Sequence, residues 1–207
     1  MSEAKSDYHQ LAPMNKVVTE FLRAHPAHCE YDETWPLQPP VPLRARLCLT
    51  DELPPIEARS SILGIVVRVD GQVLFIHPQQ PSGDIAHLLI GGRADPGETP
   101  EQALMREVAE ESGWRVEPRA LVGFRHFHHL GPLTPQMADR PYPDFLQPVY
   151  AAVADTYDAR LLLSGEAPCR FVESGWAEEV TKASHRPLLI AALCVIQHDP
   201  ARLTQPA

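Results

Sequence analysis

Two apolar runs in the middle of the chain alternate with polar and glycine-rich positions in a way that predicts a β-hairpin. Residues 61–69 are β-branched and apolar, Asp70-Gly71 follows, and residues 72–77 form a second apolar run. Asp-Gly between two such runs favours a type I′ turn, which joins antiparallel strands. A third short strand is expected at Ala86–Ile90, before a pair of glycines.

The next segment changes to a helical pattern, with clear signals at both ends. Thr99 is expected to cap the helix, Pro100 suits its first turn, and Gln102 completes a capping box. Gly113 is well placed as the left-handed residue that ends it. We therefore predict a helix over Thr99–Ser112.

Strands and helices alternate in the remainder of the chain. Strands are expected at Arg115–Phe127 and Val149–Ala154, with a loop of about twenty residues between them, which is long by the usual standard. Helices are expected at Ala177–Ala183 and Pro187–His198. This order of elements predicts the α/β class, and specifically an α/β sandwich built on a mixed β-sheet.

The N-terminal part of the chain differs from the rest in its high proline content. Eight of the 22 prolines precede residue 56, and Trp35–Pro42 is too rich in proline for a regular helix or a central strand. We divide the chain into a Pro-rich extension with one helix near Met14–Ala24, residues 1–58, and a folded domain, residues 59–207. The extension is expected to help form a homodimer.

Composition narrows the range of partners. The net charge of −9 and the pI near 5.5 argue against a nucleic-acid partner, since such proteins usually present a basic face. A small anionic substrate is compatible with acidity, because a bound cation reverses the local field. The four cysteines form no CxxC pair, and no apolar run reaches the roughly 18 residues of a membrane span. We expect a cytoplasmic protein without a membrane partner.

The predicted helix over Thr99–Ser112 places three carboxylates on one face. Glu107, Glu110 and Glu111 are spaced i, i+3 and i+4, in the half of the helix where the macrodipole disfavours anions. Such a cluster repels itself unless a hard cation such as Mg²⁺ or Mn²⁺ offsets the charge. Arg106 is expected to pair with Glu98 or Glu110 and so orient these ligands.

The full spacing of this segment is more specific than its charge. From Gly92 to Trp114 it reads Gly-x5-Glu-x7-Arg-Glu-U-x-Glu-Glu-x-Gly-U, where U is apolar. This is the Nudix box without a gap, and the chain here resembles the Nudix hydrolase family. The resemblance implies the family's α/β/α sandwich over about residues 60–200. It also implies hydrolysis of a nucleoside diphosphate linked to another moiety, such as a nucleotide, a nucleotide-sugar or a dinucleotide.

Family roles can be carried over to the matching positions of the box. The resemblance implies that Glu110 and Glu111 are the central metal ligands, that Glu107 is a ligand or base, and that the Gly91 carbonyl is a further ligand. Glu98 and Arg106 are implied to support the geometry between loop and helix. The implied cofactor is Mg²⁺, with Mn²⁺ as a substitute, and the implied chemistry is attack of water on phosphorus.

Residues that select the substrate are sought in the long loop before residue 149 and the strand before that loop. Arg140 is a candidate for holding a phosphate, and Tyr142 or Phe145 for stacking on a base. The alternative, an ordered loop with its aromatic side chains packed inward, has equal weight. His126 and His128 are expected to share one strand face and are candidates for phosphate contact, although structural histidines are the favoured interpretation.

Two other functions are compatible with the same motif. A non-catalytic nucleotide-sensing module is one alternative, but such modules commonly lose carboxylates of the box, and all are present here. An isomerase of isopentenyl-type diphosphates would need a cysteine beside the metal, and none of the four lies near the box in sequence. The sequence therefore favours the hydrolase.

Overall fold

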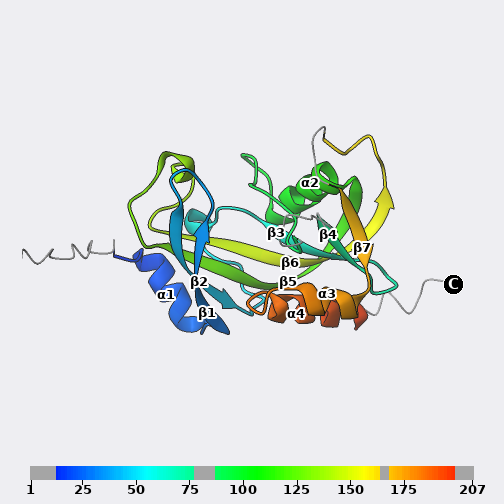
Figure 1. Cartoon of the computed structure of the whole chain (residues 1–207), viewed down its shortest axis with the longest axis horizontal. Helices are drawn as coiled ribbons and strands as arrows, with labels where there is room; N and C mark the ends of the chain where they lie inside the picture. The colour runs from blue at the N-terminus through cyan, green and yellow to red at the C-terminus, as the bar shows by residue number, and fades with distance from the viewer. Residues whose placement is uncertain (1–12, 77–86, 164–167, 199–207) are drawn as a thin grey trace, which may run out of the picture.

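A mixed seven-stranded sheet organises the part of the chain that the computed structural model describes, residues 13–76, 87–163 and 168–198 (Figure 1). Only β3 and β6 pair in parallel, and the other neighbours are antiparallel. The strand order is β1-β2-β5-β6-β3-β4-β7. The strands are β1 Cys29–Trp35, β2 Val41–Cys48, β3 Leu63–Val67, β4 Val73–Ile76, β5 Trp114–His129, β6 Asp144–Tyr157 and β7 Cys169–Val172.

Helices cover both faces of this sheet, which confirms the predicted α/β sandwich (Figure 1). Helix α2, Pro100–Ser112, packs through Leu104 and Val108 on one face, and α4, Arg186–Gln197, packs through Leu189 and Leu193 on the other. The remaining helices are α1 Lys16–Ala24, α3 Ser174–Val180 and the short 3₁₀ segments η1 Ile56–Ala58 and η2 Pro135–Met137.

Local sequence signals predicted α2 and its ends correctly. Thr99 accepts a hydrogen bond from the backbone N–H of Gln102, whose side chain accepts one from the Thr99 backbone, so the capping box is complete. Gly113 ends the helix in the left-handed region at φ 73°. These contacts fix where the helix begins, and therefore where its carboxylates lie.

The hairpin of β3 and β4 is confirmed, but its turn differs from the predicted one. The backbone N–H of Arg68 donates to the Gln72 carbonyl, so the hydrogen bond that closes the turn encloses three residues rather than two, with Gly71 at φ 89°. The segment expected as a third strand forms only isolated bridges, His87 to Ile76 and Ile90 to Gly64. Its first residue, Ala86, lies outside the described residues.

The N-terminal region contains more regular structure than a helix and a connector. The sequence predicted α1 but not the hairpin of β1 and β2, and β2 pairs with β5 from Leu43–His129 to Cys48–Phe124. Four of the eight prolines of this region belong to the hairpin. Three lie in the turn between the two strands, and Pro42 lies near the start of β2, where strands tolerate proline. Residues 29–48 are therefore part of the same sheet as the predicted domain.

A buried network of hydrogen bonds links α1 to the sheet. Asp144, whose side chain is fully buried, interacts through Oδ1 with His126 Nε2 and His128 Nδ1, each at 2.9 Å. Its Oδ2 accepts a hydrogen bond from the backbone N–H of Asn15, the residue that caps α1. Burial raises the pKa of Asp144, but the hydrogen bonds from the histidines and from Asn15 outweigh it, and the pKa falls well below its usual range.

Replacing Asp144 by Asn is expected to lower the free energy of unfolding by about 2–4 kcal/mol, because one buried oxygen that accepts hydrogen bonds becomes a donor. Because the pKa is depressed in the folded state, this contribution is present at neutral pH and is lost as pH falls below the ordinary value of 3.8. Urea denaturation at several pH values tests this. Asp155→Asn, at an exposed position on the same strand, is the control. A free energy of unfolding of Asp144→Asn equal to that of the wild type would contradict the prediction.

Candidate active site

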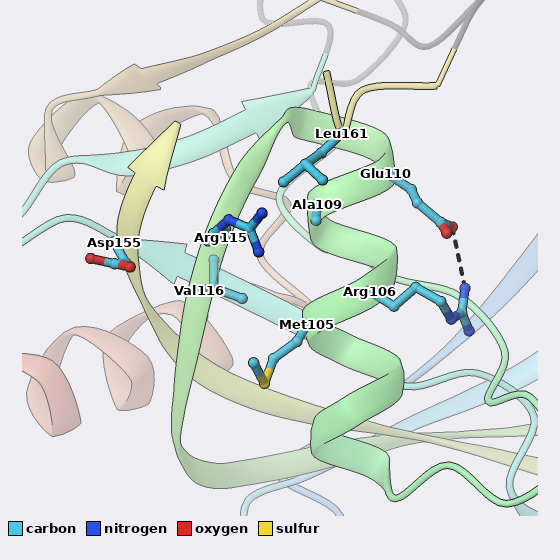
Figure 2. Close-up of a pocket in the computed structure, with 8 residues that line it drawn as sticks. All are labelled: Met105, Arg106, Ala109, Glu110, Arg115, Val116, Asp155 and Leu161. Atoms are coloured by element: carbon cyan, nitrogen blue, oxygen red, sulfur yellow. Dashed lines mark hydrogen bonds and ion pairs between the residues drawn. The ribbon is translucent and has the colours of Figure 1, made fainter. Parts of the chain in front are cut away.

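Arg106 lies at the centre of the charged face of α2. Its guanidinium donates to both carboxylate oxygens of Glu98 at 2.9 Å, to Glu107 Oε1 at 2.9 Å and to Glu110 Oε2 at 3.2 Å. It also donates to the Arg93 carbonyl at 2.8 Å. Figure 2 shows Arg106 and Glu110 projecting together, away from Met105 and Val116 on the other side of the helix.

These contacts hold the loop before α2 against the helix. The hydrogen bonds from Arg106 and from the Asp95 backbone lower the pKa of Glu98 to about 2, so this carboxylate is ionised at any physiological pH. The same carboxylates raise the pKa of Arg106, mainly through its hydrogen bonds to Glu98. The sequence predicted the pairing of Arg106 with Glu98 or Glu110, and the structure contains both pairs.

Two glycines let the backbone approach the carboxylates closely. Gly91 has φ 139°, and a Cβ there would lie 2.2 Å from the Ile62 carbonyl oxygen. A Cβ on Gly92 would lie 2.4 Å from the carboxyl group of Glu107. The backbone N–H of Gly91 donates to Glu111 Oε2 at 3.4 Å. The Gly-Gly pair therefore brings main-chain atoms beside Glu107 and Glu111.

A polar cavity of about 440 Å³ opens beside this cluster. Arg140 lines it, together with Glu107 and the Gly-Gly pair, so the structure brings one residue of the predicted substrate loop to the box. The Arg140 guanidinium lies 5.2 Å from the Trp35 ring and donates to Ser61 Oγ at 3.4 Å. Burial and the charge of Arg93 lower the pKa of Arg140 from its ordinary value of 12.5.

Comparison with known proteins agrees with this geometry. The NUDIX domain profile matches residues 58–188, more than half of the chain. The chain belongs to the Nudix family. The matched region contains the whole box, Gly92–Trp114.

Individual Nudix relatives are distant. The chain is 29% identical over 169 residues to the NAD-capped RNA hydrolase NudC of Escherichia coli O157:H7, covering 81% of this chain and 57% of that protein. It thus spans little more than half the length of this relative. A Nudix hydrolase of Nitrosomonas europaea superposes with a TM-score of 0.45 and 18% identity over 72% of this chain and 97% of the other. A Bacillus subtilis pyrophosphohydrolase superposes with a TM-score of 0.46 and 15% identity, over 79% of this chain and 96% of the other.

The glutamates of the Nudix box offer oxygen donors of the kind that Mg²⁺ prefers, but two of the expected ligands, Glu107 and Glu110, form hydrogen bonds with Arg106. Within the described part of the chain, no three acidic, histidine or cysteine side chains are already arranged so that they could hold a metal ion. Arg106 bridges Glu107 and Glu110 with a single nitrogen. Each ionised carboxylate still has further acceptor positions, and hard oxygen donors suit Mg²⁺ or Mn²⁺. The residues therefore fit a divalent cation.

The other predicted substrate residues do not line this cavity. Phe145 belongs to β6 rather than to the loop, and its buried ring stacks on Phe127. His126 and His128 face Asp144 inside the fold, because a buried carboxylate needs such partners. Tyr142 is 38% exposed and donates to the Gly131 carbonyl at 3.4 Å. Phe145 is thus packed inward rather than free to stack on a base. Both histidines have a structural role rather than contact with a phosphate.

Sequence reasoning missed five residues that line the cavity. Two of them lie beside positions that the sequence did mark: Arg93 follows the Gly-Gly pair, and Asp139 precedes Arg140. Arg93 forms an ion pair with Asp139 and so joins the box to the loop before β6. Polarity in or next to the box or Arg140 was the only signal for three of them, and the other two had none. The five residues are Ser61, Arg93, Asp95, Gln136 and Asp139.

Substituting Gly92 by Ala is expected to lower kcat between about 10- and 100-fold, because the new methyl group displaces the Glu107 carboxylate by a distance that matters for catalysis. The flexible end of Glu107 can move, so the fold should persist. Steady-state kinetics and thermal melting test this. Gly175→Ala, an exposed helical position with open space around it, is the control. Wild-type kcat in Gly92→Ala would contradict the assignment.

Proposed function

We propose that this protein hydrolyses a diphosphate linkage in a nucleoside diphosphate joined to another moiety, by a metal-dependent attack of water on phosphorus. The observation that carries the proposal is the cluster of Glu107, Glu110 and Glu98 around Arg106, beside a cavity that also contains Arg140. Anionic and cationic side chains meeting at one cavity suit a substrate that binds partly through a cation and partly directly.

Each residue of the cluster has a role in this proposal. Glu107, Glu110, Glu111 and the Gly91 carbonyl would hold Mg²⁺, or Mn²⁺ in its place. The bound ion would polarise phosphoryl oxygens and lower the pKa of a bound water. Glu107 lines the cavity, and its alternative role in this proposal is to accept the proton of the attacking water instead of holding the ion. Arg106 and Glu98 keep the carboxylates oriented.

The cationic side chains of the cavity serve the substrate. Arg140 is partly buried and contacts Trp35, Phe145 and Ser61, which together restrict the direction of its guanidinium. A fixed guanidinium can bind a phosphate group through two parallel hydrogen bonds. Arg93 lines the same cavity and adds a second positive charge. We therefore assign the diphosphate of the substrate to this cavity.

The substrate class rests on chemistry that the relatives share. One relative is named an NAD-capped RNA hydrolase, and the structural neighbours include a UDP-X diphosphatase. The net charge of −9 favours small nucleotide-like substrates over nucleic acid as partners. Among the described residues, no helix is long and apolar enough to cross a membrane. We propose that the protein works in the cytoplasm on a soluble small molecule.

A substrate screen tests this function. The purified chain is incubated with Mg²⁺ or Mn²⁺ and with nucleoside triphosphates, ADP-ribose, NADH, dinucleoside polyphosphates and nucleotide-sugars, and released phosphate and monophosphate are measured. Metal-dependent cleavage of a diphosphate-linked compound is the expected result. Nucleotide binding without cleavage of any compound would contradict hydrolysis and favour the nucleotide-sensing alternative.

We also propose that the chain forms a homodimer through its N-terminal region. Val17 and Ile56 of this region expose apolar surface, Ile56 to 75%. Light scattering should then give a mass twice the 23.0 kDa of one chain. A mass equal to one chain over a range of concentrations would contradict the proposal.

A further inference from the structure

The hairpin of β1 and β2 lies behind one wall of the cavity beside the box, which we call the active-site cavity. We call residues 130–143, between β5 and β6, the cavity loop, because three of its residues line this cavity: Gln136, Asp139 and Arg140. None of the three is fully buried, so the cavity alone does not fix the direction of their side chains. Figure 1 shows the turn between β1 and β2 beside the cavity loop.

Trp35, the last residue of β1, provides an aromatic face for the guanidinium of Arg140. The central carbon of that guanidinium lies 5.2 Å from the centre of the Trp35 ring and 5.7 Å from the centre of the Phe145 ring. A cation over an aromatic face is attracted by the ring, and a planar guanidinium can also stack on it. One of the two rings that orient Arg140 therefore comes from the N-terminal hairpin.

The Trp35 ring is itself held in place. Its Nε1 donates a hydrogen bond to Glu33 Oε1 at 2.6 Å, and the other oxygen of Glu33 accepts one from Arg125 at 3.3 Å. The rings of Phe127 and Phe145 meet the Trp35 ring edge-on, with centres 5.4 and 5.6 Å away. These contacts restrict rotation of the ring, so the aromatic face keeps one position relative to Arg140.

A second contact joins the hairpin to the cavity loop independently of Trp35. Gln136 Nε2 donates a hydrogen bond to the backbone carbonyl of Gln38, in the turn between β1 and β2. The next residue, Met137, is 1% exposed and packs in one cluster with Val41 and Leu43 of β2. The hairpin therefore contacts the loop on both sides of Asp139, at Gln136–Met137 and at Arg140.

The Nudix box holds the cavity loop from the opposite side. Asp139 forms an ion pair with Arg93, which directly follows the Gly-Gly pair. The loop thus lies between the box and the hairpin, but only the box belongs to residues 58–188, which the family profile matches. The direction of Arg140 is therefore set partly by a segment outside the matched region.

We propose that Trp35 is a positioning residue for substrate binding, because it orients Arg140 in the active-site cavity and so makes the N-terminal hairpin part of the site that binds the diphosphate. This inference rests on the proposed function. Trp35 does not line the active-site cavity, so it acts through Arg140 rather than on the substrate. Arg140 would contact the diphosphate in the ground state and in the transition state alike. Loss of Trp35 should therefore change KM rather than kcat.

Substitutions of Trp35 test this role with the substrate that the screen identifies. Trp35→Leu removes the aromatic face, and KM should rise about 5- to 20-fold with kcat nearly unchanged, within the range expected for a lost cation–π contact. Trp35→Phe keeps an aromatic face and should restore most of the affinity. Trp35→Met, whose flexible side chain fills more of the space, provides the same test if Trp35→Leu does not fold.

Trp176→Leu is the matched control. Trp176 also packs edge-on against a phenylalanine, Phe75, and lies 5.9 Å from the guanidinium of Arg170, but it is on α3 and does not line the active-site cavity. Its KM should equal that of the wild type even if its melting temperature falls. An unchanged KM in the non-aromatic variants of Trp35, or an equal rise in Trp176→Leu, would overturn the inference.

Calorimetry with imidodiphosphate, a diphosphate analogue that resists hydrolysis, separates this inference from the proposed function. It is titrated with Mg²⁺ into the wild type, Trp35→Leu, Arg140→Met and the double variant. Binding should weaken in both single variants, and the double variant should bind no more weakly than Arg140→Met, because Trp35 acts only through Arg140. This result would support the inference even if no compound were cleaved.

Two other results would contradict different claims. Equal binding by the wild type and Trp35→Leu, or losses that add in the double variant, would overturn the role of Trp35 and leave the hydrolase intact. No binding of imidodiphosphate by the wild type would overturn the assignment of the diphosphate to this cavity, and the inference with it.

Discussion

Replacing Glu110 by Gln is expected to lower kcat by a factor on the order of 10³, because the substitution removes a negative charge from the group that would hold the catalytic cation. The fold should be unaffected. Glu110 is one-third exposed, and its contact to the protein is a hydrogen bond from Arg106, which an amide oxygen can still accept. Glu110→Gln is therefore expected to lose activity while keeping the melting temperature of the wild type.

Direct metal binding makes this test specific. Titration of Mn²⁺ into the wild-type protein and Glu110→Gln, followed by electron paramagnetic resonance, should show weaker binding in the variant. Glu178→Gln, an exposed glutamate on α3, is the control for the loss of one negative charge. Full activity of Glu110→Gln, or a variant that unfolds while its remaining folded fraction keeps wild-type activity, would show that the role given to Glu110 is wrong.

Replacing Arg106 by Met is expected to lower kcat/KM about 10- to 100-fold, the usual cost of losing a residue that orients metal ligands. The variant keeps much of the aliphatic stem but removes the guanidinium from among Glu98, Glu107 and Glu110. The three carboxylates then repel one another, so the metal-free protein should melt at a lower temperature.

Magnesium distinguishes this explanation from a general loss of packing. If repulsion among the carboxylates destabilises Arg106→Met, adding Mg²⁺ should raise its melting temperature more than it raises that of the wild type. Arg23→Met, an exposed arginine on α1, should show neither effect. A melting temperature of Arg106→Met that does not respond to Mg²⁺ would contradict this account.

The parts of the protein that follow from short-range signals could be predicted from the sequence. The ends of α2 depend on Thr99, Gln102 and Gly113, which are near neighbours along the chain. The contacts of Arg106 with Glu98 and Glu110 span eight residues or fewer, so the motif contains the whole cluster. The alternation of His126 and His128 likewise placed both on one face of β5.

The parts that depend on distant partners could not be predicted in the same way. β1 has few apolar residues, and its partner β2 belongs to the sheet only through β5, far along the chain. The partner of both histidines, Asp144, lies across a strand pair whose register no local pattern specifies. For the same reason the sequence suggested Arg140 but could not show that it stacks on Trp35.

The position of β1 at the end of the sheet bears on how the protein avoids self-association through its strands. An unpaired edge strand is a template for pairing with another chain. The exposed side chains of β1 include Glu30 and Asp32, and charges on an edge strand discourage such pairing. The opposite edge, β7, has only four residues. The charged hairpin thus gives the sheet an end that resists aggregation, whereas a chain without it would present the long edge of β5.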